Sequence, residues 1–122
     1  MSKSPHTFGD LLRAFRLASG VGLRQLARGL DISAGYLSDV ELNNVPPPSE
    51  EVIVKISEIL KINRKQLLTA ARKVDPELAD YVVSRPQAAD FLRMAKDREF
   101  SDEDWERLSQ LVRISRIGKD ED

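Results

Sequence analysis

The chain has 122 residues, of which 41% are hydrophobic, and this is enough for one modest core or for a small domain with an appendage. It contains no cysteine, which excludes disulfides and thiolate metal sites, and no apolar run long enough to cross a bilayer. The first ten residues lack the apolar core of a signal peptide, so we expect a cytoplasmic protein with no membrane partner.

Charge is divided unevenly along the chain. Residues 1–72 carry 10 Lys and Arg against 7 Asp and Glu, a net charge of +3, whereas residues 73–122 carry 9 against 13, a net charge of −4. A basic half can attract phosphates while an acidic half keeps the chain dispersed. A surplus of +3 permits nucleic-acid binding but does not by itself indicate it.

The first predicted helix carries Phe8 and Leu12 on one face and ends at Ser19 and Gly20. Leu11 and Phe15 form a second apolar pair on a neighbouring face, and we expect the C-terminal helices to cover it. Residues 23–41 then show two short apolar sets with helical spacing, separated by a three-residue break, which is typical of a helix-turn-helix.

The break itself has the chemistry of a tight turn. Asp31 tolerates a left-handed backbone, Ile32 is apolar and can lie in the angle between the two helices, and Ser33 can cap the second helix. Ala27 is small, which allows the two helices to approach closely where they cross.

The rest of the chain also reads as helices. Residues 42–48 form a loop with three consecutive prolines, after which Ser49 and Asn63 are expected to cap a fourth and a fifth helix. Three more amphipathic helices begin near Pro76, Pro86 and Ser101, and they bury too little surface to be stable alone. We therefore expect them to pack on the first domain or on a second copy of themselves.

Over residues 7–72 the order of these features resembles the DNA-binding domain of lambda-repressor and Cro-like regulators, the XRE family. One departure is Asp31, because the family usually has glycine at the tight turn. The resemblance implies an all-α fold with a five-helix lambda-repressor-like DNA-binding domain in residues 1–73. The helical pattern that follows predicts a short three-helix C-terminal region in 74–117, which we expect to dimerise, and a charged tail in 118–122. The residues that carry it are Phe8, Leu12, Arg16, Leu26, Ala27, Ile32, Ser33, Tyr36, Leu37, Ser38, Glu41, Pro48, Ser49, Ile56, Leu60, Leu67 and Leu68.

In this family the second helix of the motif enters the major groove, and the preceding helix and following loop hold the DNA backbone. The corresponding helix here lacks the Arg, Asn and Gln side chains that usually discriminate between bases, so we expect few direct base contacts. Specificity is then expected to depend on two half-sites and on DNA shape. Arg16 and Glu41 are expected to form an internal ion pair, and Arg13, Arg28 and Lys55 are secondary candidates for phosphate contacts. The candidate DNA-binding residues are Leu23, Arg24, Ser33, Ala34, Gly35, Tyr36, Ser38, Asp39, Asn43 and Asn44.

These features predict a sequence-specific transcriptional regulator, a repressor that binds double-stranded DNA with an inverted-repeat operator as a homodimer. The candidate dimerisation residues are Trp105, Leu108, Leu111 and Val112. For Trp105 the simplest interpretation is a core position among the C-terminal helices, and an anchor for self-association is the alternative. One alternative function is a protein-interaction module that keeps the fold without binding DNA. Another is a repressor switched off by an ImmA/IrrE-type peptidase that cuts near residues 113–116, because the C-terminal region resembles the tails of such repressors.

No enzyme, cofactor or metal site is predicted. His6 is the only histidine, so neither a catalytic triad nor a histidine metal site can be assembled. The acidic run over residues 102–106 is best explained as the start of a helix, where the dipole favours negative charge.

Overall fold

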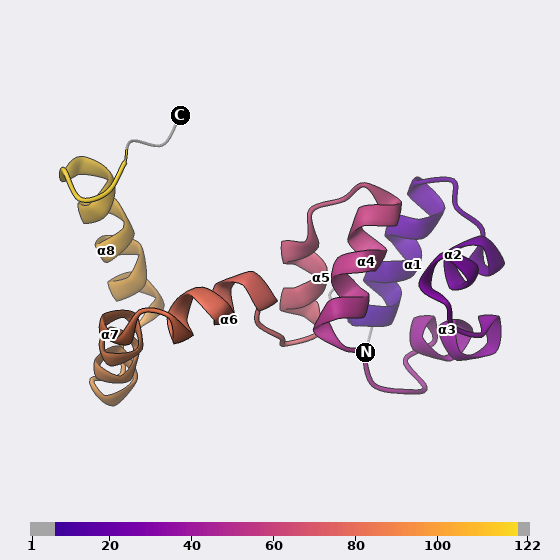
Figure 1. Ribbon diagram of the computed structural model, residues 1–122, viewed down its shortest axis with the longest axis horizontal. Helices are drawn as coiled ribbons and strands as arrows, with labels where there is room; N and C mark the ends of the chain where they lie inside the picture. The colour runs from indigo at the N-terminus through magenta and orange to yellow at the C-terminus, as the bar shows by residue number, and fades with distance from the viewer. Residues whose placement is uncertain (1–6, 120–122) are drawn as a thin grey trace. The chain divides into compact units, whose positions relative to one another are not determined.

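The computed structural model describes residues 7–119, and all the regular structure within them is helical, which confirms the predicted all-α fold class. His6 and most of the predicted charged tail lie outside these residues. None of the helices within 7–119 is long and apolar enough to cross a membrane. Figure 1 shows the helices, which are α1 (Phe8–Ala18), α2 (Leu23–Leu30), α3 (Ala34–Glu41), α4 (Glu50–Leu60), α5 (Arg64–Ala70), α6 (Pro76–Val83), α7 (Pro86–Asp97) and α8 (Asp102–Ile114).

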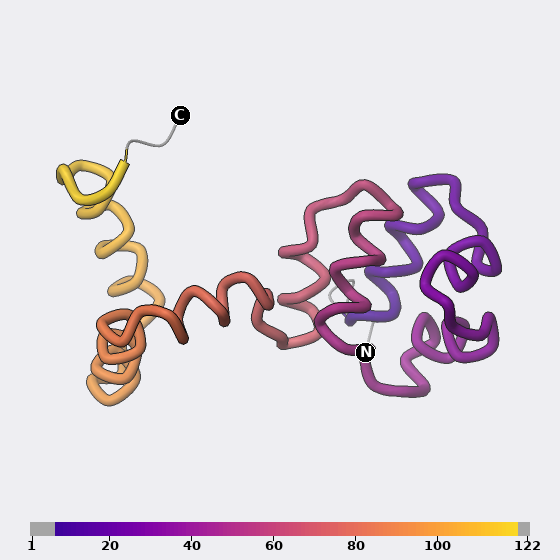
Figure 2. Tube along the Cα trace, in the orientation of Figure 1, coloured from indigo at the N-terminus to yellow at the C-terminus, as the bar shows by residue number. Residues whose placement is uncertain are grey.

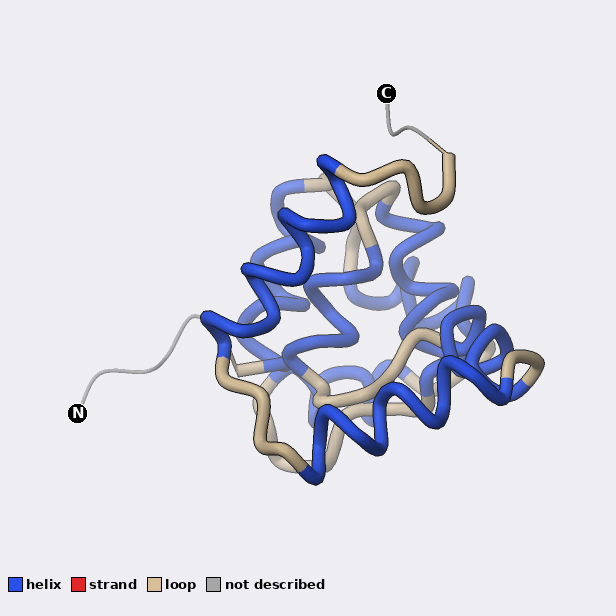
Figure 3. Tube along the Cα trace, turned by 90° about the vertical axis from the view of Figure 1, so that its left-hand side faces the viewer, coloured by secondary structure: helices blue, strands red, loops and turns tan. Residues whose placement is uncertain are grey.

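The chain divides into two compact units, Met1–Asp80 and Tyr81–Asp122, and the boundary falls within α6. In the first unit, α1 contacts α3 and α5, α4 contacts α2 and α5, and α2 packs on α3. Figure 2 shows the path of the chain through these helices. Short loops join the helices (Figure 3).

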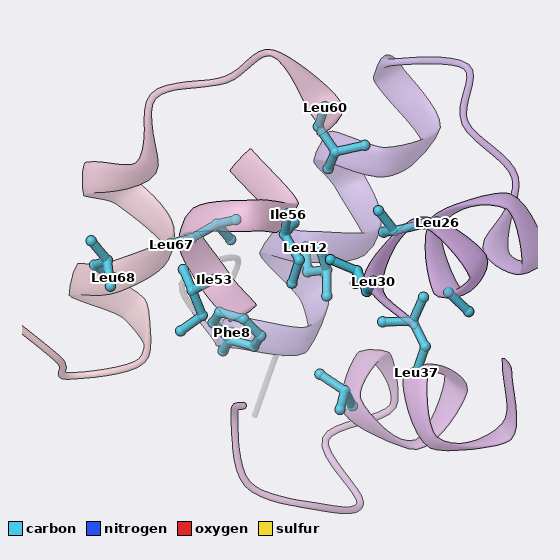
Figure 4. Packing of buried hydrophobic residues seen from close by; sticks show 12 residues of the cluster. Phe8, Leu12, Leu26, Leu30, Leu37, Ile53, Ile56, Leu60, Leu67 and Leu68 are labelled. Carbon is cyan, nitrogen blue, oxygen red and sulfur yellow. The ribbon is translucent and has the colours of Figure 1, made fainter. Parts of the chain in front are cut away.

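The core of the first unit is built from the apolar faces of α1 to α5 (Figure 4). Leu11 and Phe15 are half-buried against this core, so their apolar faces already have cover within the first unit. The buried residues of the cluster are Phe8, Leu12, Leu26, Ala27, Leu30, Leu37, Val40, Ile53, Ile56, Leu60, Leu67 and Leu68.

The turn between α2 and α3 has the form that its residues predict. Asp31 adopts a left-handed conformation with φ 59° and ψ 43°, and its N–H and that of Ile32 donate to the last carbonyl groups of α2. Ile32 packs against the core, and Ser33 Oγ accepts a hydrogen bond of 3.0 Å from the Tyr36 N–H. The turn therefore fixes the start of α3.

The second unit is held by aromatic contacts between α7 and the region at the start of α8. The ring of Trp105 lies edge-on to those of Phe91 and Phe100, with centroid separations of 6.1 and 5.3 Å. Ala95 is the one fully buried apolar residue among residues 81–119. This pair of helices consequently has an incomplete core, and the large apolar side chains that stay exposed include Leu92, Met94, Leu111, Val112 and Ile114.

Candidate nucleic-acid interface

Helix α3 has one buried side and one open side. Leu37, Val40 and Glu41 are buried, and they hold the helix against the core. Gly35, Tyr36 and Asp39 are exposed, and the period of 3.6 residues places them on the opposite side. We call these three residues, with the exposed Leu42 that follows them, the outer face of α3.

The predicted base-contacting residues are not all equally accessible. Ser33 is exposed at the start of α3, but its hydroxyl oxygen is occupied as the helix cap. Ala34 and Ser38 are half-buried, and Ala34 packs against the core, so both lie at the edge of the outer face. The outer face thus holds Gly35, Tyr36 and Asp39 of the predicted set.

Sequence reasoning did not select Leu42, whose side chain is 60% exposed at the end of α3. It lies three residues after Asp39, so the helical spacing from Asp39 was the signal that could have identified it. An exposed leucine beside a polar helix face can meet thymine methyl groups.

Asn43 and Asn44 close the C-terminal end of α3. Asn43 is left-handed, with φ 61°, and its N–H donates to the Val40 carbonyl at 3.1 Å. The Asn44 N–H donates to the Asp39 carbonyl at 2.9 Å. These two bonds form the Schellman arrangement that satisfies the last carbonyl groups of a helix.

The Asn43 side chain ties this end of α3 to the start of α1. Its Oδ1 accepts from the Gly9 N–H at 2.9 Å, and its Nδ2 donates to Asp10 Oδ1 at 3.3 Å. Only glycine fits at position 9, because a Cβ there would lie 2.6 Å from the Glu41 carbonyl oxygen. Asn43 was predicted from the sequence as a phosphate contact, whereas in the structure its side chain bonds Gly9 and Asp10 of α1.

A buried ion pair holds the same end of α3 to the end of α1. Arg16 Nε and Nη2 donate to the two carboxylate oxygens of Glu41 at 2.6 and 2.9 Å, and Arg16 Nη1 donates to the Val21 carbonyl at 3.1 Å. The hydrogen bonds and charge of Glu41 raise the pKa of Arg16 further above its ordinary value, despite burial. Arg16 is therefore a structural residue and not a free cation.

Free positive charge lies on α2. Arg24 and Arg28 are exposed, and neither forms an ion pair within residues 7–119. Leu23 is half-buried against the core, and the cap position before it is Gly22, which has no side chain to bond the first amides of α2. These amides and the neighbouring Arg24 are suited to an anionic group such as a phosphate.

The other charged candidates lie on α1, α4 and α8. Arg13 and Lys55 are exposed on α1 and α4. Asp104 is occupied at the start of α8, where it forms a capping box with Ser101. Across the described part of the chain, no three acidic or histidine side chains are grouped to hold a metal ion.

Residues 7–70 match a protein family described as a helix-turn-helix domain. No curated protein matches the chain. Among solved structures, SinR, a master regulator for biofilm formation in complex with DNA, is 29% identical, with 51% of this chain and 98% of that chain covered and a TM-score of 0.47. The clp gene regulator ClgR from Corynebacterium glutamicum is 26% identical, with 79% and 95% covered and a TM-score of 0.49. A SinR chain from a complex of SinR with SinI protein is 27% identical, with 78% and 100% covered and a TM-score of 0.48.

Proposed function

The chain belongs to the helix-turn-helix domain family, and from this membership we propose that it is a sequence-specific DNA-binding transcriptional regulator. In this proposal it acts in the cytoplasm as a repressor and binds an inverted-repeat operator as a homodimer. The motif that defines the family is the pair α2 and α3, so the proposal assigns DNA contact to these helices.

The observation that carries the proposal is the open outer face of α3, together with exposed arginines on the helix that packs against it. Gly35, Tyr36 and Asp39 are exposed while the opposite side of the helix is buried, and Arg24 and Arg28 on the adjoining helix are unpaired within residues 7–119. An α-helix fits the major groove of B-DNA, and flanking cations bind the phosphates on its rims. Asn44, which is exposed at the end of α3, completes the proposed contact set.

The experiment measures affinity for a duplex taken from the region upstream of the chain's own gene, as a function of salt. We expect log Kd to rise steeply with salt, because each phosphate contact displaces condensed counterions. Arg24→Ala should reduce the slope of log Kd against log salt concentration by about 1, the contribution of one phosphate contact. Lys65→Ala, which removes an exposed cation from α5, should leave this slope unchanged. A flat salt response of the unmodified protein would overturn the proposal and favour the protein-interaction module.

The homodimer is proposed on the incomplete core of α7 and α8. A pair of helices with one fully buried apolar residue, Ala95, does not bury enough surface to be stable alone. Trp105 packs edge-on against Phe91 and Phe100 and remains 38% exposed. It therefore contributes to the packing of α7 on α8 and has surface left for an interface. Leu111 and Val112 are about half exposed on the same helix and Leu108 is half-buried, which leaves an apolar stripe for a second copy.

Sedimentation velocity tests the dimer. The unmodified chain of 13.8 kDa should sediment as a dimer, and Leu111→Asp should sediment as a monomer because a charge on the stripe opposes burial. Gln110→Asp places the same group on the opposite side of α8 and should leave the dimer intact. Circular dichroism of Leu111→Asp shows whether its helices persist, and a monomeric unmodified protein would refute this part of the proposal.

A second candidate concerns regulation by a peptidase. Residues 113–116 are exposed, and α8 ends at Ile114 within them, so the chain is accessible there without unfolding the first unit. A cut at this point would remove the end of α8 directly after Val112 of the proposed dimer stripe, and so weaken the dimer and its binding to the operator. Incubation with the ImmA/IrrE-type peptidase encoded beside the gene, followed by mass spectrometry, should show cleavage in this segment, and intact protein would refute the candidate.

A further inference from the structure

The outer face of α3 carries one acidic side chain, and its position is unusual for a surface that meets DNA. Asp39 is exposed and forms no ion pair within residues 7–119. A carboxylate near phosphates is repelled by them, so this residue weakens general attraction to DNA. A repulsive group at the centre of an interface can instead select one partner, because it rejects every partner that offers it no donor.

The side chain of Asn44 lies within hydrogen-bond distance of the Asp39 carboxylate. Asn44 Nδ2 donates to Asp39 Oδ1 at 3.4 Å, and the Asn44 N–H donates to the Asp39 carbonyl at 2.9 Å. Asn44 is itself held because the preceding residue, Asn43, is bonded to Gly9 and Asp10 at the start of α1. A series of contacts thus connects the Asp39 carboxylate, through Asn44 and Asn43, to the start of α1.

With Oδ1 directed toward Asn44, the other oxygen of Asp39 has no hydrogen-bond partner among the described residues. An ionised carboxylate only accepts hydrogen bonds. In the major groove, cytosine offers its N4 amino group as a hydrogen-bond donor. The hydrogen-bonding groups of guanine and thymine on their major-groove edges are acceptors only. Adenine offers the N6 donor beside the N7 acceptor, and N7 repels a carboxylate that approaches N6.

We propose that Asp39 is a specificity-determining residue that selects cytosine at one position of each half-site, with Asn44 as its positioning residue. The inference rests on the proposed function, because it requires α3 to lie in the major groove. The ligand class is thus a duplex with a C·G pair under the C-terminal half of α3. The preference for cytosine is expected to be on the order of tenfold.

The experiment selects bound duplexes from a pool with a randomised centre, using the full chain, and reads the enriched sequences. The unmodified protein should enrich cytosine at one position of each half-site. Asp39→Ala should lose that preference while its affinity for unselected DNA rises, because a repulsive charge is gone. Asp39→Asn should move the preference to adenine, since an amide can donate to N7 and accept from N6.

Two further variants separate positioning from stability. Asn44→Ala should weaken the cytosine preference, with the thermal midpoint unchanged, because the backbone bonds of the helix end remain. Glu58→Ala removes an exposed acid from α4 and should leave the selected sequence unchanged. If Asp39→Ala selects the same bases as the unmodified protein while binding stays steep in salt, this inference fails and the proposed function stands. If no duplex is enriched and binding does not respond to salt, the proposed function fails first.

Discussion

Replacing Glu41 by glutamine tests how much the buried ion pair between α1 and α3 contributes to the free energy of unfolding. The change preserves the size of the side chain and removes its charge, so Arg16 is left without a counterion. The side chains of Arg16 and Glu41 are only 10% and 5% exposed, so water cannot solvate the charge of Arg16 once its partner is neutral. Two of the three hydrogen bonds that the Arg16 side chain donates go to Glu41, at 2.6 and 2.9 Å.

The expected loss is about 3–5 kcal/mol, the usual cost of removing one partner of a buried pair. A small domain is stable by about 5–15 kcal/mol, so Glu41→Gln should lose a large fraction of the total. With a urea dependence of about 1 kcal/mol per M, the midpoint of unfolding should fall by about 3 M or more.

Urea unfolding followed by circular dichroism measures this loss. Glu58→Gln makes the same chemical change at an exposed position of α4 and should stay within about 0.5 kcal/mol of the unmodified chain. The double change of Arg16 to Met and Glu41 to Leu removes both charges and should recover most of the stability, because no buried charge is left unpaired. A Glu41→Gln midpoint equal to that of Glu58→Gln would refute the reasoning.

Asp31→Gly should raise the thermal midpoint, by a stabilisation of about 1 kcal/mol, because glycine adopts the left-handed backbone at φ 59° without strain; a lower midpoint would contradict this. Gly35→Ala should stabilise the fold by about 0.5–1 kcal/mol, since its Cβ would meet no atom within 4 Å, yet weaken binding to the upstream duplex; unchanged affinity in anisotropy would count against contact at this position. Asp104→Asn tests the capping box of α8: the backbone N–H and then the hydroxyl of Ser101 lower the pKa of Asp104 below 3.8, so its stabilisation is present above that pH and is lost as the pH falls through the lowered pKa. The difference in helicity between the unmodified chain and this variant should therefore be present at neutral pH and close in acid, and a constant difference would contradict the assignment.

The fold was predictable because the signals that specify it are local. Apolar spacing identifies the core face of each helix, and the cap residues Ser33, Ser49, Asn63 and Ser101 each accept a hydrogen bond from an N–H two or three residues later. The match of residues 7–70 to the helix-turn-helix domain family confirms the family that these signals indicate.

The details of the candidate interface were not predictable in the same way, because they depend on contacts between distant residues. Asn43 accepts a hydrogen bond from Gly9, 34 positions away in the sequence, and no local pattern around either residue predicts that bond. The burial of Ala34 and the exposure of Leu42 likewise depend on how far α3 is rotated against the core. Periodicity gives that rotation only to within one residue position.

In the proposed function, a DNA-reading surface with few exposed side chains gains specificity when two copies of the chain bind together. The C-terminal end of α3 is fixed to both ends of α1, through Arg16 with Glu41 and through Asn43 with Gly9, so its few outward groups are presented without reorganisation. If one half-site gives on the order of tenfold discrimination, two half-sites read together give roughly a hundredfold, because their free energies add. Leu111→Asp, which should separate the copies, is therefore expected to reduce discrimination between operator and unrelated DNA to the single-site value while each α3 still binds. Full discrimination by a monomeric variant would show that one α3 surface reads more of the duplex than its exposed residues account for.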